Sequence, residues 1–302
     1  MARDGRLDGY DLFIASEANV SPEPDFISVT RPPVVEVALA VQFEPNTVNA
    51  LQAAQLRSKI TDKFPEYEQQ VARPPLMEDF SPAASRPPVS FEFITTQPMQ
   101  RFWFLSRDGS QLVQLQHDLL AANWRRLPGG TDYPKYRGLR AILSETLELL
   151  DGILAGEGEQ PIKPNWCEVT YINHIEPLTP EGPRPPLHQV LRWFASPDEG
   201  GFLPPPEDAQ LAERFIIGED SDPPRGRFNV SLASAFRAED RVPIWVLTLT
   251  ARIRSNEKTL SGALASLDEG RDWADRAFEQ MTTSDMHNAW GLRRMEQNEF
   301  TR

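Results

Sequence analysis

The hydrophobic period of this sequence changes several times along the chain, and the changes occur twice in the same order. Residues 34–43 alternate between apolar and polar positions, which predicts a strand, and residues 46–63 follow with the spacing of a helix that Asn46 would cap. Further strands are expected at 89–95, 101–106, 111–117 and 120–126, before a long helix at 133–154 that Gly152 and Gly156 would end. The second series has a strand at 166–175, a short helix at 186–195, strands at 209–218, 227–236 and 244–253, and a long helix at 260–281.

This repeated order predicts an α+β fold made of two βαβββ(β)α units. Each unit would form a twisted antiparallel sheet that its long helix covers on one face. Placed side by side, the two units would make one curved antiparallel sheet with both long helices on the same face. The topology resembles that of duplicated TATA-binding-protein-like and helix-grip folds, although no residue carries this resemblance. A chance agreement between the two halves is the alternative to a duplication.

Proline-rich stretches divide the chain, because proline has no backbone N–H to donate within a helix or a central strand. The chain has 28 proline residues, and groups of them at 72–88, 177–186 and 197–206 predict irregular loops. The expected organisation is a flexible N-terminal arm at 1–32, a first α+β half at 33–157, a second half at 164–283 and a C-terminal helical tail at 284–302.

The charge of the chain disfavours a nucleic-acid partner. Its 44 acidic and 31 basic side chains give a net charge of −13, which opposes binding to a phosphate backbone. The lack of a long apolar segment predicts a soluble protein with a cytoplasmic location and no contact with a membrane. The single cysteine, Cys167, excludes an intramolecular disulfide.

The sequence has no motif for catalysis, so we expect a protein that is not an enzyme and that holds no cofactor or metal. It lacks the glycine-rich loops that bind phosphate and the nucleophile elbow of hydrolases. Cys167 falls on the apolar side of its strand, where a thiol is inert. The four histidines, His117, His174, His188 and His287, lie far apart, and a metal site built from His117, His174 and Glu168 is the minor alternative.

The remaining candidate is a ligand-binding surface on the sheet face that the helices leave open. Val113 and Leu115 would face the helices, so that Gln114 and Gln116 point the other way. Amides, aromatic rings and arginine on a concave sheet suit a small polar ligand or a peptide. The candidate ligand-binding residues are Arg101, Trp103, Gln114, Gln116, Asn123, Trp124 and His174.

Two alternatives stay open for these side chains. The glutamines would form ladders between strands, and Trp124 would fill the hinge between sheet and helix. Tyr133 and Tyr136, at the start of the first long helix, would either staple that helix to the sheet or cap one end of a groove.

If Gln116 does point into an open groove, Gln116→Ala should change the free energy of unfolding by less than about 1 kcal/mol.

Several short segments together point to a family. They read Arg-Pro-Pro-Val-Val-Glu-Val at 31–37, Arg-Phe-Trp-Phe-Leu-Ser at 101–106, Gln-Leu-Val-Gln-Leu-Gln at 111–116, Asn-Trp-Arg at 123–125, Tyr-Pro-Lys-Tyr at 133–136 and Glu-Val-Thr-Tyr-Ile-Asn at 168–173. As a set, they resemble a family of sporadically distributed, functionally uncharacterised bacterial proteins, over residues 30–290 or so. The resemblance implies no particular activity and no catalytic residues. A sporadic distribution is typical of genes in mobile or defence-type loci.

The sequence therefore favours a non-enzymatic binding or adaptor protein that acts through the open sheet face or through an oligomer interface. Its partner is expected to be another protein or a second copy of the chain, or else a small polar ligand or peptide. An antitoxin-like or regulatory protein in a mobile or defence-type locus is a more specific alternative, since an acidic surface suits a basic partner. A hydrolase or nucleic-acid-processing enzyme with an unrecognised site fits neither the charge nor the motifs.

Overall fold

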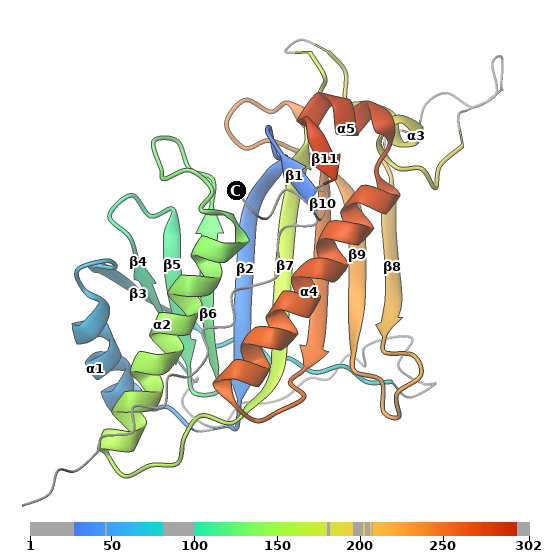
Figure 1. Cartoon of the computed structure of the whole chain (residues 1–302). Helices are drawn as coiled ribbons and strands as arrows, with labels where there is room; N and C mark the ends of the chain where they lie inside the picture. Colours follow the sequence, from blue (N-terminus) through green and yellow to red (C-terminus); the bar gives the residue numbers. More distant parts are fainter. Residues whose placement is uncertain are drawn as a thin grey trace, which may run out of the picture.

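The fold is built around one large antiparallel sheet (Figure 1). The computed structural model describes residues 27–45, 47–80, 100–179, 182–195, 202, 206 and 208–294. Nine strands follow one another across the sheet in the order β3 (Glu66–Val71), β4 (Gln100–Leu105), β5 (Gln111–Gln116), β6 (Leu119–Arg125), β2 (Val34–Phe43), β7 (Pro164–Ile175), β10 (Pro243–Arg254), β9 (Gly226–Phe236) and β8 (Gln210–Ile217). All neighbouring pairs are antiparallel, so the predicted α+β class is confirmed.

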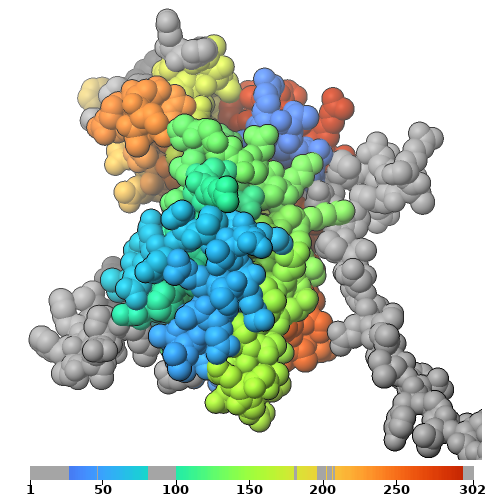
Figure 2. Space-filling view, turned by 90° about the vertical axis from the view of Figure 1, so that its left-hand side faces the viewer, coloured from blue at the N-terminus to red at the C-terminus, as the bar shows by residue number. Residues whose placement is uncertain are grey.

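Two long helices, α2 (Lys135–Gly156) and α4 (Leu260–Met281), cover one face of this sheet (Figure 1). A third helix, α1 (Ala50–Ile60), packs on the outer side of α2, and Figure 2 shows these two helices in contact. Two short helices, α3 (Leu187–Val190) and α5 (Ser284–Trp290), lie beyond one end of the sheet. None of the described helices combines the length and the apolar character needed to cross a membrane.

The core forms where the apolar faces predicted from the sequence meet. α2 buries a stripe with helical spacing, whereas β2 buries alternate residues on the same side; the stripe is Leu139, Leu143, Leu147, Leu150 and Leu154, and the strand residues are Val37, Leu39, Val41 and Phe43. α4 approaches the sheet closely at Gly270. A Cβ atom added there would lie 3.1 Å from Val169 Cγ2 and 3.3 Å from Ala251 Cβ. Glycine therefore allows the helix to pack directly on β7 and β10.

The strand order is mirrored about the central pair of β2 and β7, which joins the two halves of the chain. Outward from β2 come β6, β5 and β4, and outward from β7 come β10, β9 and β8. Each half contains a strand, a helix, further strands and a long helix, although β3 has no counterpart in the second half. A duplication as the origin of this order stays a prediction.

The sequence pattern does not predict β3, which pairs with β4 at one edge of the sheet. None of its residues is buried. A strand that is exposed on both faces has no reason to alternate between apolar and polar residues, so it carries no periodic signal. The strand predicted at 89–95 lies outside the described residues.

Helix boundaries differ from the predicted ones where a local hydrogen bond or a bridge decides them. Asn49 caps α1, accepting from Leu51 N at 2.7 Å while Gln52 Oε1 accepts from Asn49 N at 2.7 Å; the predicted cap, Asn46, lies outside the described residues. α2 continues through Gly152 and ends at Gly156. The short helix α3 covers only four of the ten residues expected, since the chain leaves it at Leu191 to form a bridge with Thr282.

The two ends of the described chain pair with each other. β1 (Ile27–Val29) and β11 (Leu292–Arg294) form a separate two-stranded antiparallel sheet. Their apolar side chains pack against the core around α4. The sequence places the first segment in the N-terminal arm and the second in the helical tail, because strands of three residues are too short to show a period. The structure attaches both segments to the body of the protein.

Two glycines in the long helices test this packing. Gly270→Leu should lower the free energy of unfolding by about 1–3 kcal/mol, because the new side chain would collide with Val169 and Ala251. Gly152→Ala should raise it by about 0.5–1 kcal/mol through helix propensity, since an added Cβ there meets nothing within 4 Å. Urea unfolding of both variants beside the wild type measures the two changes. Equal effects would contradict the close approach of α4 to the sheet.

Candidate functional site

The sheet face opposite the long helices is crossed at one end by residues 72–80, which we call the strap. Glu78 of the strap pairs with Arg252 of β10, at 2.9 Å from Nη1, and with Arg227 of β9, at 3.0 Å from Nε. The ring of Phe80 lies 5.0 Å from the Arg227 guanidinium. In Figure 1 this segment passes behind the lower end of the sheet. The strap therefore covers part of the face that the sequence predicts to be open.

Gln116 binds the strap and not an open groove. Its Oε1 accepts from Arg73 N at 3.0 Å, and its Nε2 donates to Arg73 O at 3.2 Å and to Asp118 Oδ1 at 2.7 Å. Gln42 holds Leu76 in the same way, donating from Nε2 to Leu76 O at 3.0 Å and accepting from Leu76 N. Only 1% of Gln116 is exposed, so its amide has no group left for a ligand.

Four of the predicted residues do meet on this face, around the amide of Gln114. Its Oε1 accepts from Arg101 Nη1 at 3.1 Å and from Trp103 Nε1 at 3.0 Å. Its Nε2 donates to Asn123 Oδ1 at 2.6 Å, and Asn123 in turn donates to Glu36 Oε1 at 3.4 Å. Gln114 and Asn123 are buried. The two amides therefore bond to each other, as in the predicted ladder between strands, whereas Arg101 Nε is buried without a hydrogen-bond partner among the described residues.

Trp124 and His174 lie apart from this cluster. Trp124 faces the long helices, because strand alternation places it opposite Asn123; its Nε1 donates to Thr131 O at 2.9 Å. The interpretation of Trp124 as an open-face residue is therefore wrong, because its side chain belongs to the core on the helix side of the sheet. His174 stands near the end of β7, and burial lowers its pKa. No hydrogen bond recorded for the described residues links it to Gln114.

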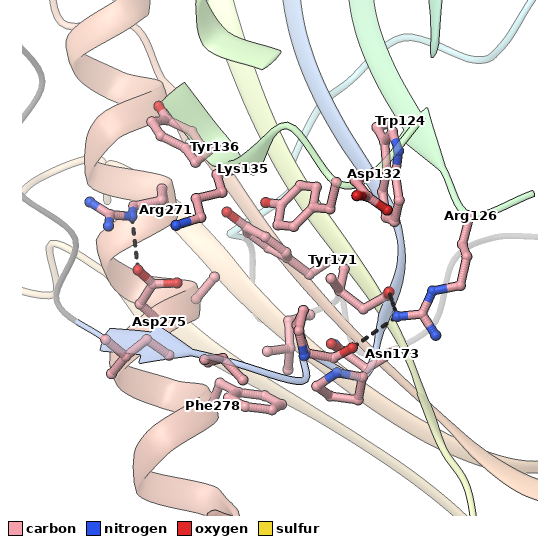
Figure 3. A pocket seen from close by; sticks show the side chains of 18 of the residues that line it. Trp124, Arg126, Asp132, Lys135, Tyr136, Tyr171, Asn173, Arg271, Asp275 and Phe278 are labelled. Carbon is pink, nitrogen blue, oxygen red and sulfur yellow. Dashed lines mark hydrogen bonds and ion pairs between the residues drawn. The ribbon is translucent and has the colours of Figure 1, made fainter. Parts of the chain in front are cut away.

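A cavity of about 590 Å³ opens on the helix side of the sheet, at the first turn of α2 (Figure 3). The strands β6, β7 and β10 contribute its floor, α4 forms one wall, and the segment from β1 to the start of β2 forms another. Five of the lining side chains are aromatic: Trp124, Tyr133, Tyr136, Tyr171 and Phe278. The rings of Trp124 and Tyr133 pack at 4.9 Å between centroids. The cavity therefore has an aromatic wall built from two segments of the chain.

Ionic contacts hold α2 and α4 together beside the cavity. Asp268 of α4 accepts from Tyr136 Oη at 2.7 Å and from Arg140 Nε and Nη2 at 2.8 and 2.9 Å. Within α4, Arg271 Nε lies 2.8 Å from Asp275 Oδ2. Burial raises the pKa of Tyr136 well above its ordinary value, so this phenol keeps its proton and donates a hydrogen bond to Asp268. These charged groups are committed to the fold.

Three other polar side chains at the cavity have unused hydrogen-bonding groups. Among the described residues, the hydroxyl of Tyr171 and the ammonium of Lys135 have no hydrogen-bond or ion-pair partner. Arg126 uses only Nη2, which donates to Pro32 O at 2.8 Å and to Val34 O at 2.7 Å. Burial raises the pKa of Tyr171 well above its ordinary value, so its hydroxyl stays protonated and can donate.

The loop at the cavity mouth is held by Asp108. Its Oδ2 accepts from Thr131 N at 2.8 Å and from Thr131 Oγ1 at 2.6 Å, while Oδ1 accepts from Ser106 Oγ at 2.6 Å and from Ser110 N at 3.0 Å. These hydrogen bonds, led by that of Ser106, hold the pKa of Asp108 well below its usual range. The ionised carboxylate thus positions Thr131, which lines the cavity.

The described part of the chain contains neither a cluster of metal ligands nor a reactive thiol. No group of three or more His, Cys, Asp and Glu side chains there could hold a metal ion. Cys167 is buried, its Sγ lies 3.5 Å from Ala263 O, and burial raises the pKa of its thiol. A thiol of this kind remains protonated and unreactive.

Comparison with known proteins yields no relative: no family model and no curated protein matches the sequence, and no solved structure matches the fold. The resemblance to sporadically distributed bacterial proteins therefore stays a prediction.

Sequence reasoning missed the cavity, although it singled out several of its residues. Tyr133 and Tyr136 were candidates to staple a helix or cap a groove, and Tyr171 falls on the face that alternation assigns to the core. The one indication of a cavity in the sequence is a tyrosine among core positions, because a buried hydroxyl needs a hydrogen-bond partner. The sequence does not show which residues surround Tyr171, because they depend on where β1 and α4 pack.

The attachment of the strap predicts a result opposite to that expected from the sequence for Gln116→Ala. Removal of this buried amide leaves the backbone of Arg73 without partners, and the free energy of unfolding should fall by about 1–3 kcal/mol. Gln111→Ala, at a half-buried position of the same strand, is the control and should have little effect. Urea unfolding measures stability, and chymotryptic cleavage after Leu76 or Met77 reports release of the strap. Wild-type stability and cleavage in Gln116→Ala would contradict this role.

Asp108 predicts a dependence of stability on pH. Its folded-state pKa is lowered, so its contribution to stability is present above the unfolded pKa of about 4 and is lost as pH falls toward the folded value. The wild type should therefore melt at a higher temperature than Asp108→Asn at pH about 6, and the difference should shrink below pH about 4. Thermal unfolding across this range tests the role, and a difference that stays constant with pH would refute it.

Proposed function

We propose that this protein is a non-enzymatic binding protein that holds a small ligand in the cavity beside α2 and α4. The observation that carries the proposal is the hydroxyl of Tyr171. It projects into a cavity of about 590 Å³ and bonds to no described residue (Figure 3). A polar group without a partner costs free energy unless water or a ligand supplies one. The volume falls within the range of about 300–1,000 Å³ that is typical of small-molecule sites.

The opposite sheet face offers less to a ligand. The amides of Gln114 and Asn123 bond to each other, and Gln116 binds the strap. A ligand there would have to break hydrogen bonds that the protein already makes, whereas a ligand in the cavity would complete one that is absent. For this reason the proposed site is the cavity and not the face that the sequence favours.

A binding role fits the lining of the cavity better than catalysis does. Neither Cys167 nor any of the four histidines belongs to the described lining. Arg271 and Asp275, which do belong to it, form an ion pair with each other. The remaining groups are aromatic rings, hydroxyls, cations, the Asn173 amide and the Asp132 carboxylate, which recognise a ligand by packing, hydrogen bonds and charge.

Two tyrosines in this region separate binding from stability. Tyr171→Phe should change the free energy of unfolding by less than about 0.5 kcal/mol, because its hydroxyl has no partner in the described chain. Tyr136→Phe removes the hydrogen bond to Asp268 and should cost about 1.5–3 kcal/mol. Thermal and urea unfolding of both variants checks the difference. Equal losses would show that the Tyr171 hydroxyl belongs to the fold and not to a ligand site.

Native mass spectrometry of gently purified protein tests occupancy directly. The wild type should retain a small mass that is absent under denaturing conditions, and Tyr171→Phe should retain less of it. The Lys59→Gln variant serves as a control at an exposed position of α1 outside the cavity and should keep the wild-type occupancy. A clean, ligand-free mass for the wild type would argue against the proposal.

A further inference from the structure

We infer that the ligand of this cavity is an aromatic ring system that carries an anionic group, a carboxylate or a phosphate. The inference rests on the proposed function and adds the chemical class of the ligand. Three features of the lining lead to it: an excess of positive charge, a guanidinium already fixed in position, and a strained lysine at the start of α2.

The charge of the cavity is opposite in sign to that of the protein. Three cationic and two anionic side chains belong to the described lining: Arg126, Lys135, Arg271, Asp132 and Asp275. Arg271 and Asp275 neutralise each other at 2.8 Å. Arg126 and Lys135 are exposed at the mouth, with Asp132 as the one other charge there, so an excess of positive charge remains in a chain of net charge −13. Such a local excess attracts an anion.

Arg126 is held in position before any ligand binds. Its Nη2 donates to the carbonyl oxygens of Pro32 and Val34, which fixes the orientation of the guanidinium. Nε and Nη1 have no hydrogen bond to any described residue and remain available to an anionic oxygen. A prearranged donor of this kind loses little side-chain entropy when it binds, and charge-assisted hydrogen bonds are the strong ones.

Lys135 occupies a backbone conformation that lysine rarely adopts. Its φ angle is +60°, in the left-handed region, although it is the first residue of α2. Strain of this kind costs free energy and tends to persist at functional sites. Figure 3 shows Lys135 and Arg126 on opposite sides of Tyr171 in this view. All three side chains line the same cavity, so that two cations border the site of a ligand.

The walls determine the uncharged part of the ligand. Trp124 and Tyr133 present adjacent rings, 4.9 Å apart and tilted by 40°, and Tyr171 adds a third ring whose hydroxyl bonds to no described residue. Aromatic walls favour a planar, aromatic ligand, which stacks on or meets the edges of these rings. A single ring system with an anionic substituent fits both the volume and the position of the cations.

Isothermal titration calorimetry with three indole compounds tests the inference. Indoleacetate, tryptophol and tryptamine share one ring and carry a carboxylate, a hydroxyl and an ammonium group. We expect indoleacetate to bind at least about tenfold more tightly than tryptophol, and tryptamine to bind most weakly. Adenosine monophosphate and adenosine form a second pair; a preference for the monophosphate supports phosphate as the anion, and a preference confined to indoleacetate supports carboxylate.

Variants of the two cations test whether the preference for indoleacetate arises in this cavity. Lys135→Gln should weaken indoleacetate binding by about fivefold to tenfold and leave tryptophol binding unchanged, and Lys135→Arg should restore it. Arg126→Gln should act in the same direction, with Arg126→Lys as the variant that keeps the charge. Lys59→Gln on α1 makes the same change of charge at an exposed helix position outside the cavity and should have no effect.

The two proposals fail in different ways. Equal or tighter binding of tryptophol or tryptamine would overturn the anionic class and leave the cavity as a ligand site. Equal loss of indoleacetate binding in Lys59→Gln and Lys135→Gln would also overturn it, because the effect would then be one of net charge. If none of these compounds binds, the inference is overturned, and a small mass retained in native mass spectrometry would still support the proposed function.

Discussion

The structure depends on the antiparallel pairing of β2 with β7. This ladder runs from Val34 opposite Asn173 to Phe43 opposite Pro164 and joins two halves of the chain into one sheet. Its residues on the helix side, such as Leu39 and Val169, are fully or almost fully buried. Both strands also have a hydrogen-bonded neighbour on their other side, so neither presents an edge. Because the ladder places the two halves in one plane, α2 and α4 share a face and enclose a common core.

The two faces of the sheet are closed by different physical means. On one face, apolar side chains from the strands and helices exclude water. On the other, the strap is held by the amides of Gln42 and Gln116 and by an ionic group in which Glu168 and Glu78 both bind Arg252. Buried ion pairs and hydrogen bonds of side-chain amides add little net free energy to folding, but they fix where a segment lies. Specific hydrogen-bond and ion-pair partners thus fix the position of the strap, whereas the helices are held mainly by the apolar surface that they bury.

The cavity exists because α2 and α4 pack closely along only part of their length. Tyr136 and Arg140 bind Asp268 at the border of the cavity, and beyond that point the first turn of α2 and the later turns of α4 leave space above the sheet. Core packing would normally fill such a space. Here the lining instead keeps a hydroxyl that has no partner in the described part of the chain and a lysine with strained backbone. A site that retains such costs is a better candidate for function than a face whose amides already bond to other groups of the protein.

Much of the fold follows from the sequence by itself. Alternation identified β2, β5, β7, β9 and β10, and it placed Val113 toward the helices and Gln114 away from them, because a strand with one buried face must alternate. Helical spacing located α2 and α4 for the same reason. Tertiary structure alone decided the rest: the exposed edge strand β3, the pairing of β1 with β11, the partners of Gln116, and the meeting of Trp124, Tyr133, Tyr171 and Arg126 around one cavity. These features arise from contacts between residues far apart in the chain, and such contacts leave no period in the sequence that carries them.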